Sequence, residues 1–242
     1  MIITKTTRAL VAGVVLAGAS RVSAQSPPPG DDRAFVTVNV GAQPQRRDFE
    51  TGASFTVFGE TATIRARQHV GNGPMFDVNG GYRVWNRVAV GVGFSSFHKS
   101  GGGLVGASVP DPLFFNRPRI VNAEVSDLGH NERAVYLQAV WLMPVTRTIE
   151  AALAAGPSFI QVSQQLVSTG TVAGTQSLTP VVETQRKMAN GVNAGIDVSY
   201  LLARRFSPIV FARFNGATVN LPSVSNLKVG GLQTGIGGRL RF

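Results

Sequence analysis

The sequence contains no cysteine in 242 residues, and this absence removes several kinds of protein from consideration. Without thiols there is no disulfide scaffold, no thiolate metal site and no cysteine nucleophile. Long apolar runs are missing too. The longest is Ala9–Ala19, whereas a membrane-spanning helix needs roughly 20 apolar residues. After residue 24 nothing approaches that length, so any membrane role must use strands.

The first residues have the layout of an export signal. Lys5 and Arg8 precede the apolar run, and Val22-Ser23-Ala24 supplies the small residues that a signal peptidase reads. We therefore expect residues 1–24 to be a signal peptide cut after Ala24. Its removal takes away three basic residues and no acidic one, so the net charge falls from +10 to +7. Because an exported chain does not meet nucleic acid, we expect anionic lipid or lipopolysaccharide as the partner of this charge.

The remainder of the chain alternates with a period of two. Residues 25–33 are rich in proline and charge and predict a flexible leader. Beyond them helical spacing is weak, and 28 glycines would be costly inside helices. Apolar and polar residues alternate in eight segments: 35–42, 75–84, 88–97, 133–143, 149–162, 188–201, 208–218 and 230–242.

The connections between these segments alternate in length. Three are short (85–87, 144–148 and 203–207) and four are long (43–74, 98–132, 163–187 and 219–229). Tight periplasmic turns and long outer loops are typical of a transmembrane up-and-down barrel. The prediction is an all-β, antiparallel barrel of eight strands. Residues 53–67 also resemble a hairpin, which we interpret as an extension of the first loop; the alternative is two more spanning strands, making ten.

The polarity of the two faces distinguishes a membrane barrel from a soluble one. Each segment has one continuous apolar face, such as Val88, Val90 and Val92, while the opposite face carries small and charged residues. A soluble barrel would point its apolar face inward. An eight-stranded lumen is just wide enough for side chains to fill. We expect ion pairs to plug it, formed by Asp77, Arg83, Glu150, Asp197, Arg213, Arg239 and Arg241.

Aromatic residues on the apolar faces sort by strand end. Such rings form belts at the two membrane interfaces. The belt at the periplasmic end is predicted to contain Tyr82, Trp141 and Tyr200 together with Phe242, and the other belt Phe94, Phe159 and Phe214.

The final stretch, GIGGRLRF, is a period-two strand whose last apolar residues are Leu240 and Phe242. With the signal peptide and the hairpin GGYRV-WN-RVAVGVGF, it resembles the small outer-membrane β-barrel superfamily of OmpA/OmpX-like proteins. The resemblance covers residues 34–242 and implies a barrel domain in the bacterial outer membrane. It also implies that barrel-assembly machinery reads the last strand, which then pairs with the first. No peptidoglycan-binding domain follows, so an anchoring role through one is not implied.

Some small barrels are enzymes, so the histidines need attention. We expect His69, His98 and His130 in outer loops or at the upper end of a strand. His98 lies beside Ser96 and Ser100, but this spacing is common on one strand and no matching acid is identifiable. We therefore expect no catalysis, no cofactor and no metal site.

The loop VPDPLFFNRPR, residues 109–119, is the strongest candidate for an interaction. Its prolines would stiffen an exposed apolar tip; the alternative is a lid over the barrel mouth. Its candidate residues are Leu113, Phe114, Phe115, Arg117 and Arg119. Other basic residues expected outside, facing lipopolysaccharide phosphates, are Arg46, Arg47, Arg65, Arg67, Arg186 and Lys187.

These features predict an integral outer-membrane protein with a structural or interaction role, such as envelope integrity, adhesion or binding through its loops. The alternatives are a narrow pore for small solutes and a secreted soluble barrel.

Overall fold

The computed structural model describes residues 32–242 except 45–46, 115–116, 174–176 and 223. The predicted signal peptide and nearly all of the leader therefore lie outside the described residues. No helix in the described part of the chain is long and apolar enough to span a membrane. The strands described are β1 (Ala34–Gln43), β2 (Arg47–Val57), β3 (Glu60–Val70), β4 (Gly73–Trp85), β5 (Val88–Val109), β6 (Arg119–Pro144), β7 (Ile149–Ala173), β8 (Ser177–Tyr200), β9 (Phe206–Leu221) and β10 (Val224–Arg241).

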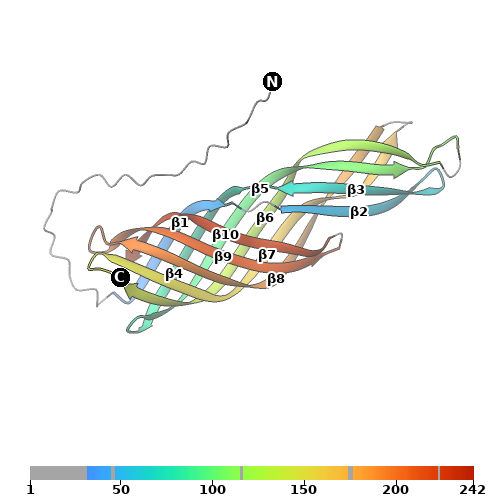
Figure 1. Ribbon diagram of the computed structural model, residues 1–242. Helices are drawn as coiled ribbons and strands as arrows, with labels where there is room; N and C mark the ends of the chain where they lie inside the picture. Colours follow the sequence, from blue (N-terminus) through green and yellow to red (C-terminus); the bar gives the residue numbers. More distant parts are fainter. Residues whose placement is uncertain (1–31, 45–46, 115–116, 174–176, 223) are drawn as a thin grey trace, which may run out of the picture.

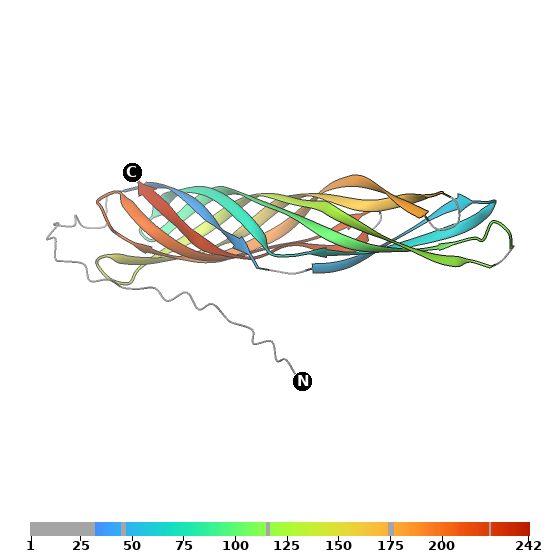
Figure 2. The same cartoon turned by 90° about the horizontal axis from the view of Figure 1, so that it is seen from above.

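Eight of these strands form a closed antiparallel ring in the order β1, β4, β5, β6, β7, β8, β9 and β10. β1 pairs with both β4 and β10, which closes the cylinder between the first and last strands. At the seam the Ala34 amide donates to the Phe242 carbonyl at 3.1 Å, and the Phe242 amide donates to the Ala34 carbonyl at 2.9 Å. Figures 1 and 2 show the barrel and the C-terminus at one end of it. The prediction of an eight-stranded up-and-down barrel is confirmed.

The two faces of the ring differ sharply in polarity. Val90 is 52% exposed and Ile236 is 62% exposed on the outside, whereas Asp77 is fully buried in the lumen. Successive side chains along a strand point to opposite faces, so the pairing register of a strand decides which of its residues face the lumen and which face outward. The outer surface of all eight strands is apolar, as in the transmembrane class of barrel. The lumen holds the buried charged and polar side chains, together with apolar ones such as Phe35, Val140 and Phe211. The outward apolar residues include Val36, Val38, Val40, Phe76, Val84, Val92, Leu137, Leu153, Val192, Val198, Val210 and Leu232.

Short connections join the strands at the end of the barrel where the chain terminates. β4 and β5 are joined through Asn86, which has a positive φ of 30°. The β6–β7 turn is closed by the Val145 amide, which donates to the Ile149 carbonyl at 2.9 Å, and the β8–β9 turn by the Leu202 amide, which donates to the Phe206 carbonyl at 3.2 Å. These are the three tight turns predicted for the periplasmic side.

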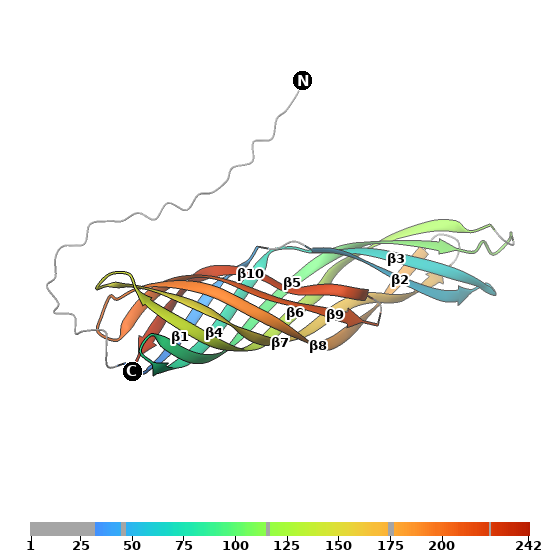
Figure 3. The ribbon, with the colours of Figure 1, turned by 60° about the horizontal axis from the view of Figure 1, so that its bottom comes forward.

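At the other end the prediction of long loops is wrong, because the strands continue. β5 and β6 stay paired up to Val109 and Arg119, and β7 and β8 up to Ala173 and Ser177. The pattern there still has a period of two, but most of its apolar residues point inward instead of outward. A search for outward apolar faces therefore misses these segments. Together they form an elongated extension beyond the ring (Figures 1 and 3).

The β2–β3 hairpin belongs to this extension and does not line the ring. β3 pairs with the upper part of β5, from Thr63–Ser108 to Gln68–Gly103. The interpretation as an extension of the first loop is confirmed, and the alternative of ten spanning strands is wrong. The extension has its own apolar core, formed by Ile64, Ala66, Val105, Ala107, Val109, Val121, Val167 and Leu178.

A charge placed in the apolar belt tests this division of faces. Val90→Arg is expected to lower the free energy of unfolding in phospholipid vesicles by about 2–4 kcal/mol, since a basic side chain would enter hydrocarbon. Thr63→Arg, on the outer face of the extension, is the matched control and should change it by less than about 0.5 kcal/mol. Denaturant titration with heat-modifiable migration in a gel measures both. Equal effects of the two substitutions would contradict the membrane-facing assignment.

Candidate functional site

The lumen contains three layers of hydrogen-bonded polar side chains, and the middle layer centres on Asp77 of β4. Its carboxylate accepts from Arg213 Nη1 at 2.6 Å, from Asn39 Nδ2 at 2.6 Å and from Asn79 Nδ2 at 2.9 Å, and also from the Tyr136 hydroxyl. These partners come from four strands around the ring. A buried carboxylate with this many donors is well satisfied, so the layer joins opposite walls of the barrel.

Tyr136 fills the middle of this layer. The Arg213 guanidinium lies over its ring, 4.7 Å from the centroid, and also donates to its hydroxyl. The ring has room because residue 93 on the neighbouring strand is glycine: a Cβ there would overlap the aromatic ring. The small residue at Gly93 and the large one at Tyr136 are thus complementary halves of one packed layer.

The layer nearest the C-terminus contains a second set of ion pairs. Arg239 donates to the Asp197 carboxylate and lies 3.7 Å from Glu150 Oε1, while Arg241 donates to the same Glu150 oxygen at 2.9 Å. Arg239 also lies over the Phe35 ring at 4.9 Å. Thus six of the seven residues expected to pair across the lumen do so. Arg83 takes part in none of the ion pairs among the described residues, although it lies beside Arg241 and Glu150 in the same hollow.

The third layer closes the mouth of the barrel, above the apolar belt, around Glu132 of β6. One carboxylate oxygen accepts from Arg47 Nη1 at 2.7 Å and faces His130 Nε2 at 2.8 Å. The other accepts from the Gly230 amide at 3.0 Å and from Gln43 Nε2 at 3.3 Å. Gly230 has a positive φ of 82°, a conformation that favours glycine, and its amide is bound by Glu132, which also ties the start of β2 to the barrel.

The surroundings of Glu132 set its protonation. Burial by itself would raise the pKa of this carboxyl, but the hydrogen bond and charge of His130 and the charge of Arg47 outweigh burial and hold the pKa below its ordinary value of 4.5. Glu132 is therefore ionised at neutral pH. Among the described residues, no group of three or more histidine, aspartate and glutamate side chains could hold a metal ion.

Two expectations about this layer are wrong. Arg47 was expected to face lipopolysaccharide, but its side chain is only 12% exposed because it reaches into the mouth to pair with Glu132. His130 was expected in a loop or at the upper end of a strand, but it is buried on β6. The parity of β6 carries the missed signal: Tyr136 and Gln138 face the lumen, and counting back by twos gives Glu132 and His130.

The other predicted residues occupy the outer surface. The belt residues Tyr82, Trp141, Tyr200, Phe94, Phe159 and Phe214 are all exposed, as are Leu240 and Phe242 at the end of the chain. At the β5–β6 tip, Leu113 is 82% exposed and Phe114 lies under the Arg117 guanidinium, 5.7 Å from its ring centroid. This tip lies at the far end of the extension, away from the barrel mouth (Figure 1). Arg119 begins β6, while Phe115 and Arg46 lie outside the described residues.

Comparison with known proteins gives structural similarity only. No family model and no curated protein matches the chain. It is similar to Neisserial surface protein A at 13% identity and a TM-score of 0.49, covering 86% of this chain and 97% of that one. It is similar to the outer membrane protein OprG of Pseudomonas aeruginosa at 11% identity and a TM-score of 0.47, covering 88% and 98%. A third similar structure is the outer membrane protease OmpT of Escherichia coli, at 10% identity and a TM-score of 0.48, covering 87% and 97%. The protease activity is a property of OmpT.

The middle layer predicts a strong effect from removing one charge. Asp77→Asn leaves the Arg213 guanidinium buried without its carboxylate, so we expect the free energy of unfolding in detergent micelles to fall by about 3–5 kcal/mol. The double variant Asp77→Asn/Arg213→Met should recover part of that loss, because no unpaired charge remains. A double variant no more stable than the single one would contradict the pairing.

The third layer, around Glu132, predicts that the stability of the protein depends on pH. Because the folded pKa of Glu132 is lowered, its contribution to stability is present above its unfolded pKa near 4.5 and is lost as the pH falls through the folded value. The difference in unfolding free energy between the native chain and Glu132→Gln should therefore be full at about pH 7 and shrink below about pH 4. Glu183→Gln, at an exposed site on β8, is the control. A difference that persists unchanged at low pH would contradict this assignment.

Proposed function

We propose that this protein is an integral outer-membrane barrel with a closed lumen, which displays a rigid β-structured extension outside the cell as an interaction surface. The observation that supports this proposal most directly is the combination of an apolar outer wall with paired charges in the lumen. In water the outer wall would be left exposed, whereas in a bilayer it is the surface that lipid covers.

The layered lumen supports an interaction role over transport. Asp77 and Arg213 come from β4 and β9, on well-separated parts of the ring, and their ion pair crosses the lumen. Opening a path would separate buried charges, which costs several kcal/mol for each broken pair. Two further layers lie above and below this one. A channel would need all three to move aside.

Positive charge just above the apolar belt supports the orientation. Arg133 of β6, Arg186 of β8 and Lys228 of β10 are exposed, and each lies beyond the last outward apolar residues of the membrane segment on its strand. We propose that they contact lipopolysaccharide phosphates, which attract such cations. At the opposite end, the outward Leu240 and Phe242 support recognition of the last strand by the barrel-assembly machinery.

Catalysis is not part of the proposal. His98 Nδ1 contacts Asn131 Oδ1 at 2.5 Å, and His69 Nδ1 contacts Asp48 Oδ1 at 2.6 Å on an open surface. Neither serine near His98 is a hydrogen-bond partner of it among the described residues. The side chains that the fold buries, including His130, are instead used to hold the layers of the lumen together.

Conductance separates this proposal from a pore. Reconstituted into planar bilayers, the folded protein is expected to give no stepwise current, because the three layers close the lumen. Removing the middle layer with Tyr136→Ala/Arg213→Ala is expected to raise the frequency of openings above that of the native chain. Fractionation with the outer membrane and heat-modifiable migration verify location and folding. Steady conductance by the native protein would contradict the closed lumen and favour the pore.

A further inference from the structure

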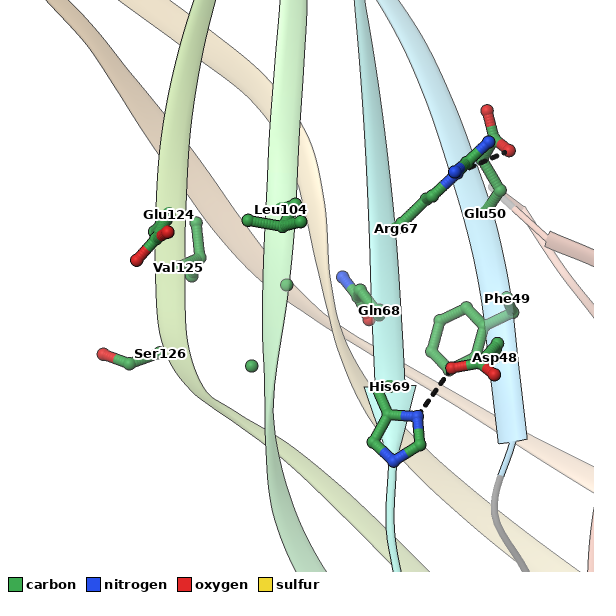
Figure 4. Close-up of a pocket in the computed structure, with 12 residues that line it drawn as sticks. Asp48, Phe49, Glu50, Arg67, Gln68, His69, Leu104, Glu124, Val125 and Ser126 are labelled. Atoms are coloured by element: carbon green, nitrogen blue, oxygen red, sulfur yellow. Dashed lines mark hydrogen bonds and ion pairs between the residues drawn. The ribbon is translucent and has the colours of Figure 1, made fainter. Parts of the chain in front are cut away.

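The extension carries a groove on its outer face, away from the layers that close the lumen. It lies over β5, between β3 on one side and β6 on the other (Figure 4). A cavity of about 790 Å³ lies near the barrel, and a second of about 720 Å³ adjoins it farther out. Both are within the usual size of small-ligand sites. The two cavities share Glu50, Arg67, Leu104 and Glu124.

The strand register aligns the lining residues in cross-strand rows. One row is Glu50, Arg67, Leu104 and Glu124, from β2, β3, β5 and β6 in turn. The next row outward is Gly52, Arg65, Gly106 and Asn122. Leu104 lies about 33 Å along β5 from Phe94, the last aromatic residue of the belt, at the usual rise per residue. The groove therefore lies well outside the bilayer.

Glycines keep the floor of the groove open although the backbone does not require them. A Cβ at Gly102 would meet nothing nearer than the Val125 carbonyl oxygen at 3.7 Å, and one at Gly106 nothing nearer than Asn122 Oδ1 at 3.4 Å. Neither has a positive φ. By contrast, a Cβ at the adjacent Gly101 would overlap backbone atoms of His69. Glycine is a poor strand former, so the fold itself does not call for glycine at positions 102 and 106. Their effect is to leave open space on the outer face of β5.

The groove carries charges of both signs. On β2, Glu50 lies 3.6 Å from Arg67, whereas Glu124 on the far wall and Arg65 form none of the ion pairs among the described residues. The cavity near the barrel is also lined by Asp48 and His69, which lie 2.6 Å apart, so acids stand on both walls with the arginines of β3 between them. A ligand with a net charge of either sign would therefore meet like charges as well as opposite ones. An uncharged ligand with many hydroxyl groups gains at both, because it donates to carboxylates and accepts from guanidinium groups.

We propose that this groove binds an uncharged oligosaccharide. Its hydroxyl groups donate to the Glu124 and Glu50 carboxylates and accept from Arg65 and Arg67. Leu104, 64% exposed between the two cavities, packs against the C–H face of a sugar ring. This inference rests on the proposed function only in placing the groove on the outer side of the membrane. Binding itself can be measured with the purified protein in micelles.

The test fills the groove without disturbing the fold. The probes are neutral hexose oligosaccharides of two to six rings, a matched set in which the rings carry carboxylates, and a set with sulfates, titrated into the folded protein by calorimetry. Neutral probes are expected to bind, with an affinity that changes less than about twofold between about 50 mM and 500 mM salt, since no net charge is neutralised. Gly106→Val and Glu124→Ala are each expected to weaken binding at least about tenfold by steric blockage or loss of an acceptor.

Two variants serve as matched controls. Ser54→Val places the same side chain on the outer face of β2 but outside the groove, and Glu183→Ala removes an exposed acid from β8. Both should bind like the native chain, and heat-modifiable migration checks that all variants fold. The proposal is overturned if no neutral probe binds, if Gly106→Val binds as tightly as Ser54→Val, or if acidic probes bind more than tenfold tighter than neutral ones. None of these outcomes bears on membrane location or conductance.

Discussion

The closed ring of this chain follows from the need to pair backbone groups where no water is available. In hydrocarbon an unpaired N–H or C=O group costs several kcal/mol, so strands cross a bilayer only as a closed ring. β1 meets that requirement by pairing with β4 on one side and β10 on the other. A ring of eight strands encloses a lumen just wide enough for side chains to fill, and here side chains do fill it.

Whether lipid or water surrounds a strand then decides which of its faces is apolar. Both situations occur along the same strand. In the lower part of β5, Val88 to Phe94 point outward on alternate residues, while the lumen side carries alanine, glycine and serine. In the upper part, Val105, Ala107 and Val109 point inward, and the outer face carries glycine and serine apart from Leu104. In the lower part, lipid contacts the outward apolar side chains. In the upper part, water surrounds the strands, so the apolar side chains are buried inside. The Glu132 layer lies at the level where one arrangement gives way to the other.

Much of this arrangement could be predicted from the sequence. The strand faces, the eight-membered ring and the short turns follow from period-two patterns and tight connections. The extended upper strands could not be predicted in the same way, because their apolar residues occupy the opposite face and are diluted by glycine and threonine. The Glu132 layer is only partly readable from the sequence: the parity of β6 places His130 beside Glu132, but Arg47 is 85 residues away from Glu132, and only the folded register brings it to the same carboxylate. The groove over Gly102 and Gly106 likewise exists only because β3 joins β5.

The inversion of faces between membrane and extension is the central claim, and the absence of native cysteine makes it directly measurable. Single cysteines at Val36, Val90, Leu137 and Ile236, and at Leu104 and Ile120 in the extension, can each carry a spin label in reconstituted vesicles. All six positions are apolar and exposed. Labels at the first four positions are expected to collide with lipid-soluble oxygen and to be shielded from a water-soluble nickel chelate. Labels at Leu104 and Ile120 are expected to show the reverse. Ready access of the chelate to Val90 and Ile236 would contradict the inversion of faces.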